Sequence, residues 1–167
     1  MPGDFLLQQQ IRYRWDGGVE QALAAVQSAC GELTIVLLTP FGTRGTVIHQ
    51  HDLQVDVTGE QAGQLPFAPE HILLDVQRTY LAPPPNPPRV GTRERSVGEQ
   101  RITESWEDGR LIERVFHPTH DGDDLVRIRY REGAAADAPS AVLESERFAY
   151  QLDVTTLSRS AIACGVR

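Results

Sequence analysis

The sequence predicts a mostly β, antiparallel domain, and three observations indicate this class. Apolar and polar residues alternate along many short segments, which is typical of strands with one buried face. Glycine-containing turn signals separate these segments. The chain has 167 residues, the length of one domain with a sizeable core. We therefore predict a single domain over residues 1–167.

The predicted strands follow one another as a meander. Segments with clear alternation are 11–15, 53–57, 126–130 and 148–154. The clearest hairpin joins 103–107 to 110–116 through Asp108-Gly109, because Asp-Gly favours a two-residue turn between antiparallel strands. These segments and their turns predict about ten strands.

Residues 68–81 form the one predicted helix. Pro69 suits the first helical turn, and the prolines from Pro83 onward end the helix. Its apolar residues share one helical face, namely Ile72, Leu73, Val76 and Tyr80. The concave face of the sheet is the surface available to bury them, so the helix would cover an apolar interior.

Residues 19–29 allow two interpretations. Their alanines have high helical propensity. Gly17-Gly18 before the segment and Gly31 after it fit a strand between two turns equally well. The pattern alone leaves the choice open.

Composition excludes several functional classes. The net charge of −7 argues against nucleic acid as a partner, because phosphate binding needs a basic face. No apolar run is long enough to span a bilayer, and the N-terminus lacks a secretory signal pattern. Cys30 and Cys164 match no metal or redox spacing. They form either one disulfide in an oxidising compartment or two unrelated buried thiols.

Two clusters contain residue types that bind metals. His49 and His51 would point to the same side of a strand, but the sequence fixes no third ligand, and we interpret them as exposed residues beside a turn. The segment 117–124 is rich in His and Asp, but it does not match the calcium-loop spacing, and a turn explains it more simply. We predict no metal site and no cofactor.

No motif points to catalysis. Nucleophile signatures and a phosphate-binding glycine loop are absent from the sequence. The acidic residues near the hairpin are expected to form a solvated face; they are Glu104, Glu107, Asp108 and Glu113. Arg127, Arg129 and Arg131 could meet anionic headgroups, but a solvent-facing strand is favoured. We predict that the protein is not an enzyme.

The segment 33–44 is the most unusual one. It is apolar at nearly every position up to Leu38 and then turns at Pro40-Phe41-Gly42. A phenylalanine at the tip of a tight turn either packs back on the domain or contacts a partner. The residue pattern leaves this choice open, and Pro40, Phe41 and Gly42 are the candidate loop for contact with a membrane or another protein.

This turn carries a family resemblance. The run Leu37-Leu38-Thr39-Pro40-Phe41-Gly42-Thr43 resembles the leucines and threonine that lead to Asn-Pro-Leu-Gly in LolB. This chain lacks the Asn and has Phe in place of Leu. Residues 68–81 resemble the helix of that family, 103–116 its paired strands and 143–157 its closing pair. The chain thus resembles the LolA/LolB-like outer-membrane lipoprotein superfamily, most closely an uncharacterised LolB-type family.

The resemblance implies a half-open antiparallel β-barrel of about eleven strands with a helix lid over an apolar cavity. It also implies that 19–29 is a strand and that Phe41 matches the protruding residue that engages the membrane. The implied location is the periplasmic side of the outer membrane, with a lipid anchor that this sequence does not contain.

The expected function is a carrier or acceptor of a lipid, acyl chain or lipoprotein. The alternative is a scaffolding lipoprotein that docks another envelope protein. Expected partners are an acylated molecule, the inner leaflet of the outer membrane or another envelope protein, and no nucleic acid. Large apolar residues on the predicted strands and helix are the candidate cavity wall, namely Trp15, Leu23, Ile35, Leu37, Leu73, Val76 and Trp106.

Overall fold

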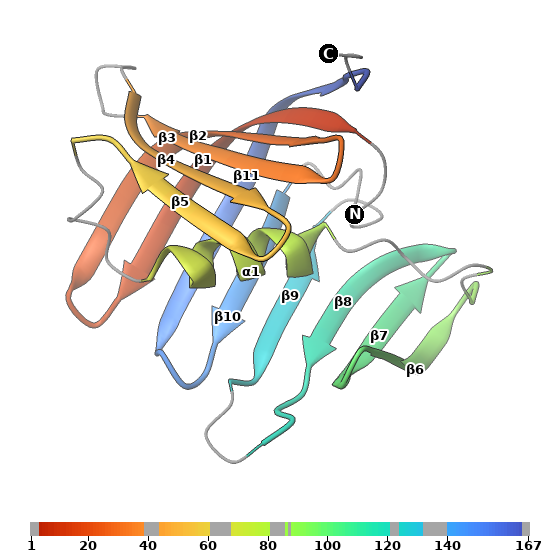
Figure 1. The fold of residues 1–167 in the computed structure, drawn as a ribbon. Coiled ribbons are helices and arrows are strands. Elements are labelled where there is room, and N and C mark those ends of the chain that lie inside the picture. The colour runs from red at the N-terminus through yellow and green to blue at the C-terminus, as the bar shows by residue number, and fades with distance from the viewer. Residues whose placement is uncertain are drawn as a thin grey trace. The chain divides into compact units, whose positions relative to one another are not determined.

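The computed structural model describes residues 4–38, 44–60, 68–80, 86, 88–120, 124–131 and 140–164. These residues form eleven strands and one helix (Figure 1). In chain order they are β1 (Phe5–Trp15), β2 (Gly18–Ala29), β3 (Glu32–Leu38), β4 (Arg44–His51), β5 (Gln54–Thr58), α1 (Pro69–Thr79), β6 (Gly91–Val97), β7 (Gln100–Glu107), β8 (Arg110–Phe116), β9 (Val126–Tyr130), β10 (Ser140–Ser145) and β11 (Tyr150–Ala161).

The strands form one sheet in the order β5-β4-β3-β2-β1-β11-β10-β9-β8-β7-β6. Pairing is antiparallel from β2 to β5 and from β6 to β11. The sheet is open, because β5 and β6 are its two end strands. The predicted class, mostly β with about eleven antiparallel strands and one helix, is confirmed.

Local elements also match the expectations. Residues 19–29 lie within β2 and are a strand, as the resemblance implied. The helix predicted over 68–81 is α1. At the predicted hairpin, Asp108 and Gly109 join β7 to β8 with φ angles of 49° and 75°, the left-handed pair that a tight hairpin turn requires.

The chain divides into two compact units. Unit 1 comprises residues 1–11, 21–80 and 156–167, and unit 2 comprises residues 12–20 and 81–155. The single-domain organisation stays a prediction, and each unit is described by itself below.

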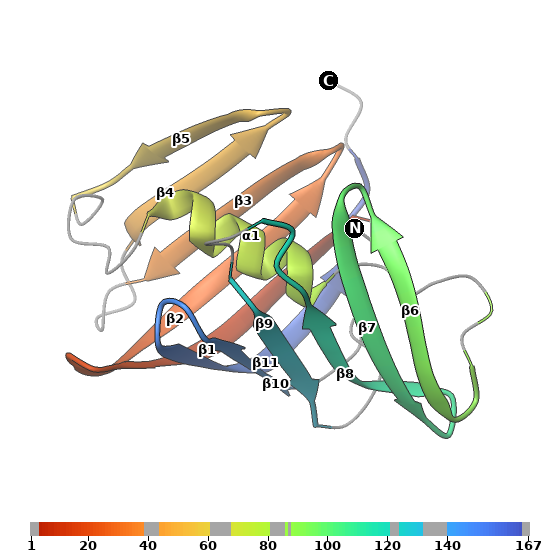
Figure 2. The same ribbon diagram turned by 90° about the horizontal axis from the view of Figure 1, so that it is seen from below.

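In unit 1, α1 packs on one face of the sheet formed by β2 to β5 (Figures 1 and 2). We call the face covered by α1 the inner face and the opposite one the outer face. The core of unit 1 joins strand residues of the inner face to two residues contributed by α1 and its C-cap; it contains Phe5, Leu7, Val26, Leu33, Ile35, Ile48, Leu73 and Tyr80. A hydrogen bond of 2.7 Å from Gln77 Nε2 to Gln50 Oε1 also ties α1 to β4.

The helix forms where its sequence predicts. Pro69 occupies the first turn, where its missing N–H costs no hydrogen bond. Glu70 in the first turn and Arg78 in the last complement the helix dipole. The helix ends at Thr79, and the backbone N–H of Tyr80 donates to the carbonyl of Val76.

A disulfide closes one end of unit 1. Cys30 and Cys164 are bonded, with their Cα atoms 5.3 Å apart, within the range that the bond requires. Cys30 lies in the turn between β2 and β3, and its backbone N–H donates to Asp4 Oδ1 at 3.2 Å. The two cysteines therefore form one disulfide and are not unrelated buried thiols. Both residues are exposed.

Unit 2 contains β6 to β10 and the first half of β11. Burial alternates along β7 and β9 and is more continuous along β8 and β10. The buried apolar residues of this unit include Ile102, Trp106, Leu111, Phe116, Val126, Ile128, Tyr130 and Leu143. Tyr13 stacks on Trp15 with ring centroids 4.8 Å apart and also contacts Tyr150. In the part of the chain that is described, no helix is long and apolar enough to cross a membrane.

The disulfide is expected to stabilise the fold. The bond closes a loop with a sequence separation of 134, so it removes much conformational freedom from the unfolded chain. Replacing both cysteines by serine should lower the free energy of unfolding by about 2–4 kcal/mol, measured by urea denaturation. Dithiothreitol should shift the wild-type midpoint to that of the variant and leave the variant unchanged. Equal midpoints for the oxidised wild type and the variant would contradict this expectation.

Candidate functional site

The predicted interior beneath the helix lies in unit 1. Leu73 of α1 is 3% exposed and packs with Ile35 and Ile48 on the inner face of the sheet. Tyr80, directly after α1, contacts Phe5 with ring centroids 5.9 Å apart. The region immediately below Leu73 is therefore filled by side chains of the core.

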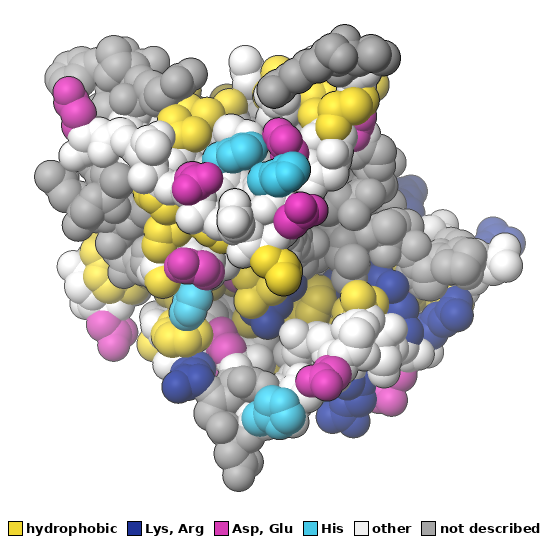
Figure 3. Space-filling model, in the orientation of Figure 1, with side chains coloured by type: hydrophobic (Ala, Val, Ile, Leu, Met, Phe, Trp, Pro, Cys, Tyr) yellow, Lys and Arg dark blue, Asp and Glu magenta, His cyan; other side chains and the backbone are white. Residues whose placement is uncertain are grey.

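Around this core lies a set of side chains that are only half-buried. They pack against the core and are all aliphatic: Leu37, Val55, Val57, Ile72 and Val76. We call these five residues the aliphatic fringe. They come from β3, from the end strand β5 and from α1, so they follow the line where the helix meets the edge of the sheet. Figure 3 shows hydrophobic side chains at the surface of the face on which α1, β4 and β5 lie in Figure 1.

The core of unit 1 also contains a polar group. Gln9 is buried, and its Nε2 donates to the hydroxyl of Tyr80 and, at 3.5 Å, to Thr156 Oγ1. Burial raises the pKa of the Tyr80 hydroxyl above its ordinary value of 10.0, and the hydrogen bonds with Thr156 and Gln9 oppose that shift. Tyr80 therefore stays protonated at neutral pH and holds a buried hydrogen bond between α1 and β1.

Four of the seven predicted wall residues lie together. Ile35 and Leu73 are in the core of unit 1, and Leu37 and Val76 are in the aliphatic fringe. Leu23 pairs with Leu38 while its neighbour Ala24 pairs with Leu37. It therefore lies on the outer face, where it is 41% exposed.

The remaining predicted site residues lie elsewhere. Trp106 is buried in unit 2. Trp15 is half-buried in the same unit, where it stacks on Tyr13. Pro40, Phe41 and Gly42 lie outside the described residues, so the membrane-contact loop stays a prediction.

Unit 2 contains a buried ion pair that the sequence did not predict. Glu104 and Arg114 are both 0% exposed. Arg114 donates to Glu104 Oε1 from Nε at 2.9 Å and from Nη2 at 2.7 Å, and Arg95 Nη2 donates to the same oxygen at 3.0 Å. A buried carboxylate is tolerated only when such donors surround it.

The expectation of a solvated acidic face was therefore wrong for Glu104. The available signal was its position along the strand: Glu104 lies two residues from both Ile102 and Trp106, so it faces the same side as these buried residues. Its partner Arg114 lies directly opposite on β8. Glu104 Oε2 and Trp106 Nε1 have no hydrogen-bond partner among the described residues.

The arginine ladder faces away from this core and is paired with carboxylates. Arg127 and Arg129 both contact Glu113, at 3.1 and 3.2 Å, and Arg129 also contacts Glu144 at 3.2 Å. Arg131 lies 3.9 Å from Asp153. These cross-strand pairs agree with the interpretation of the ladder as a solvent-facing strand.

The structure also locates the two groups of residues that the sequence offered as possible metal ligands, namely segment 117–124 and the pair His49 and His51. Asp124 accepts hydrogen bonds from Ser145 Oγ at 2.5 Å and from the backbone N–H of Arg147 at 2.9 Å, a turn-stabilising role; residues 121–123 lie outside the described part. His49 and His51 lie on β4, and both contact Glu32. Ligand atoms of Asp4, Cys30 and Cys164 lie close together, but the two sulfur atoms are bonded to each other.

Comparison with known proteins gives a family and several similar solved structures. A family model described as a protein of unknown function (DUF3261) matches residues 6–158. No curated protein matches the chain. Among solved structures, the chain is similar to one described as "putative outer membrane lipoprotein-sorting protein domain from Vibrio parahaemolyticus", with 7% sequence identity and a TM-score of 0.47. That match covers 95% of this chain and 85% of the other.

The buried ion pair yields a stability prediction. Arg114→Met removes the guanidinium and leaves the Glu104 carboxylate buried with Arg95 as its charged partner. We expect the free energy of unfolding to fall by about 3–5 kcal/mol, measured by urea denaturation. The matched control is Arg129→Met on the exposed ladder, which should cost less than about 1 kcal/mol. Similar losses in both variants would show that burial does not decide the effect.

Tyr80 yields a pH prediction. Its folded-state pKa is raised, so its contribution to stability is fully present below the unfolded pKa of about 10 and is lost as the pH rises through the folded value. The chain has no lysine, so few other groups titrate in this range. The free energy of unfolding should fall more steeply above about pH 10 in the wild type than in Tyr80→Phe. Parallel pH profiles from urea denaturation would contradict this assignment.

Proposed function

The chain belongs to the family described as a protein of unknown function (DUF3261), and we propose that this member carries or accepts an acyl chain. The sequence resemblance had already indicated an uncharacterised family. The ligand would be a lipid or an acylated protein. It would bind along the aliphatic fringe of unit 1, between α1 and the edge of the sheet. The proposed role is binding and transfer, without a catalytic step.

The single observation that supports this function is the aliphatic fringe itself. Its five side chains offer only carbon atoms to a ligand. An alkyl chain has no hydrogen-bonding groups to satisfy, so such a surface selects it over polar ligands. The fringe is half-buried, so a ligand can reach it while the core below Leu73 stays packed.

The free energy available from burying an alkyl chain on this surface is modest. Burial of one methylene contributes about 0.8 kcal/mol. About six methylenes laid along the fringe would contribute roughly 5 kcal/mol before the cost of association. Such an affinity is reversible, as transfer of a ligand from one protein to another requires.

The disulfide supports the proposed location. Bonded cysteines persist in oxidising compartments such as the periplasm, and Cys30 and Cys164 are bonded and exposed. The proposed location is the periplasmic side of the outer membrane. Free thiols at Cys30 and Cys164 in protein isolated from its native compartment would contradict this location.

The test compares two tryptophan substitutions on the same helix. Val76 belongs to the aliphatic fringe, whereas Leu74 is 41% exposed and lies outside it. Val76→Trp should fill the fringe and weaken binding of a dansyl-labelled fatty acid by at least about tenfold, the equivalent of roughly two methylenes. Leu74→Trp should change binding less than about twofold. Fluorescence anisotropy gives the affinities, and circular dichroism verifies the fold of each variant.

A second measurement separates a carrier from a scaffold. Native mass spectrometry of wild-type protein should detect a bound lipid, and Val76→Trp should lose it. If wild-type protein contains no lipid and does not bind the probe, the alternative of a scaffolding lipoprotein is favoured. Equal probe binding by Val76→Trp and Leu74→Trp would show that the ligand does not bind along the aliphatic fringe.

A further inference from the structure

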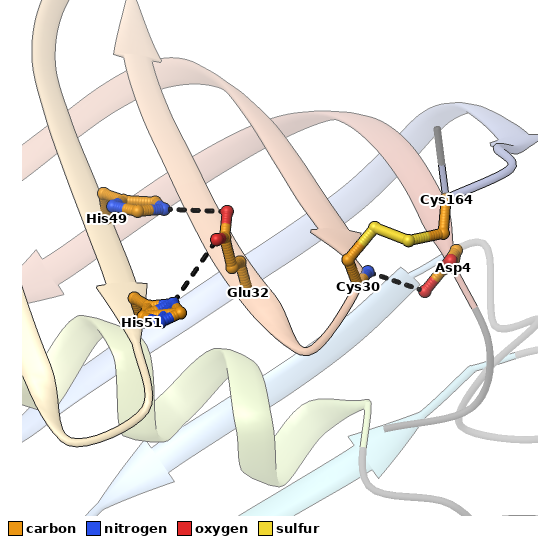
Figure 4. Close-up of a disulfide and its surroundings, with 6 residues drawn as sticks. All are labelled: Asp4, Cys30, Glu32, His49, His51 and Cys164. Carbon is orange, nitrogen blue, oxygen red and sulfur yellow. Dashed lines mark hydrogen bonds and ion pairs between the residues drawn. A yellow bond between two sulfur atoms is a disulfide. The ribbon is translucent and has the colours of Figure 1, made fainter. Parts of the chain in front are cut away.

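Three side chains gather on the outer face of unit 1, away from the aliphatic fringe. His49 Nε2 lies 3.3 Å from Glu32 Oε2, and His51 Nδ1 lies 3.3 Å from Glu32 Oε1. Figure 4 shows both rings turned toward this one carboxylate. Histidine and acidic side chains also lie next to one another at the surface in Figure 3.

Strand register places these residues together. His49 and His51 are two apart on β4, so they project from the same side of the sheet. On β3, Thr34 pairs with His49 and Leu33 with Gln50, so Glu32 lies at the level of His51. The sequence contained the two histidines with metal-ligand spacing, and the fold supplies the third ligand that it did not fix.

We propose that Glu32, His49 and His51 form a binding site for a divalent transition-metal ion of the zinc type. Two imidazoles and one carboxylate are a ligand set that Zn²⁺ takes in proteins. With metal–ligand bonds of about 2.0–2.1 Å and tetrahedral angles, two ligand atoms lie about 3.3 Å apart. Each imidazole nitrogen lies 3.3 Å from a different oxygen of the Glu32 carboxylate, and the His49 contact is a hydrogen bond. Binding would therefore turn both rings from these contacts toward one shared ion.

The surroundings complete the site. Asp52 Oδ2 lies 3.6 Å from His51 Nε2, the ring nitrogen that faces away from Glu32. A carboxylate on the second nitrogen is the usual support of a metal-bound histidine, because it fixes the orientation of the ring. Asp56 on β5 pairs with His49 in the register. Three carboxylates therefore lie around two imidazoles, a charge distribution that attracts a cation.

Glu32 lies next to the turn that contains the disulfide. Glu32 is the first residue of β3, two positions after Cys30, whose bond to Cys164 anchors the turn. The side chains of Glu32, His49 and His51 are 40%, 36% and 57% exposed. An ion can thus enter from solvent, and the exposed His51 ring can turn toward it without disturbing the core. The fourth position of a tetrahedral ion would remain open to water or to a donor from another molecule.

The experiment is isothermal titration calorimetry of the untagged, oxidised protein with zinc chloride. We expect one ion per chain. His49→Gln, His51→Gln and Glu32→Gln should each weaken binding at least about tenfold, and Asp52→Asn about tenfold or less. His71→Gln, which changes a histidine on α1, is the matched control and should bind within about twofold of the wild type.

A measurement on the wild-type protein tests the same site without relying on variants that could misfold. In a nitrogen-15 spectrum of the wild-type histidine rings, added zinc should shift the resonances of His49 and His51 and leave His71 unchanged. Absence of a one-to-one isotherm, or zinc-dependent shifts confined to other histidines, would overturn the proposal. So would wild-type affinity in a His49→Gln, His51→Gln double variant. None of these outcomes depends on lipid binding, so the two proposals succeed or fail separately.

Discussion

The register of the antiparallel strands is the constraint on which the rest of the structure depends. Side chains alternate between the two faces of a strand, so a slip of one residue would exchange the faces completely. In unit 1, the pairing of β3 with β4 places Ile35 and Ile48 directly opposite each other on the inner face, under α1. The same pairing places Thr34 and His49 opposite each other on the outer face. One register therefore determines both the apolar core and the histidine cluster.

The same alternation of side chains separates a buried ion pair from an exposed ion pair in unit 2. Glu104 and Arg114 face the core and bind each other at full burial, where a lone charge would be prohibitive. Arg129 and Glu113 face the solvent, where their attraction is weak and screened. Both pairs consist of one arginine and one glutamate. The face of the sheet on which each pair lies therefore decides how strongly it affects the free energy of unfolding.

The two proposed sites use opposite faces of unit 1 and differ in chemistry. The aliphatic fringe arises because one helix of eleven residues leaves the apolar side chains at the edge of the sheet half-covered. The histidine cluster arises because the register of β3 and β4 places the Glu32 carboxylate beside two imidazoles. The first surface suits an alkyl chain and the second suits a cation, and neither requires the other.

The sequence by itself determined the elements, because alternation, glycine turns and proline positions act over a few neighbouring residues. The β class, the hairpin at Asp108-Gly109 and the helix that begins at Pro69 follow from such local patterns. Tertiary structure decided what depends on partners distant in the chain. It bonded Cys30 to Cys164, turned Leu23 outward and brought Glu32 to the histidines. Pairing between strands sets these contacts, and a local pattern identifies only the pairing of two strands joined by a tight turn.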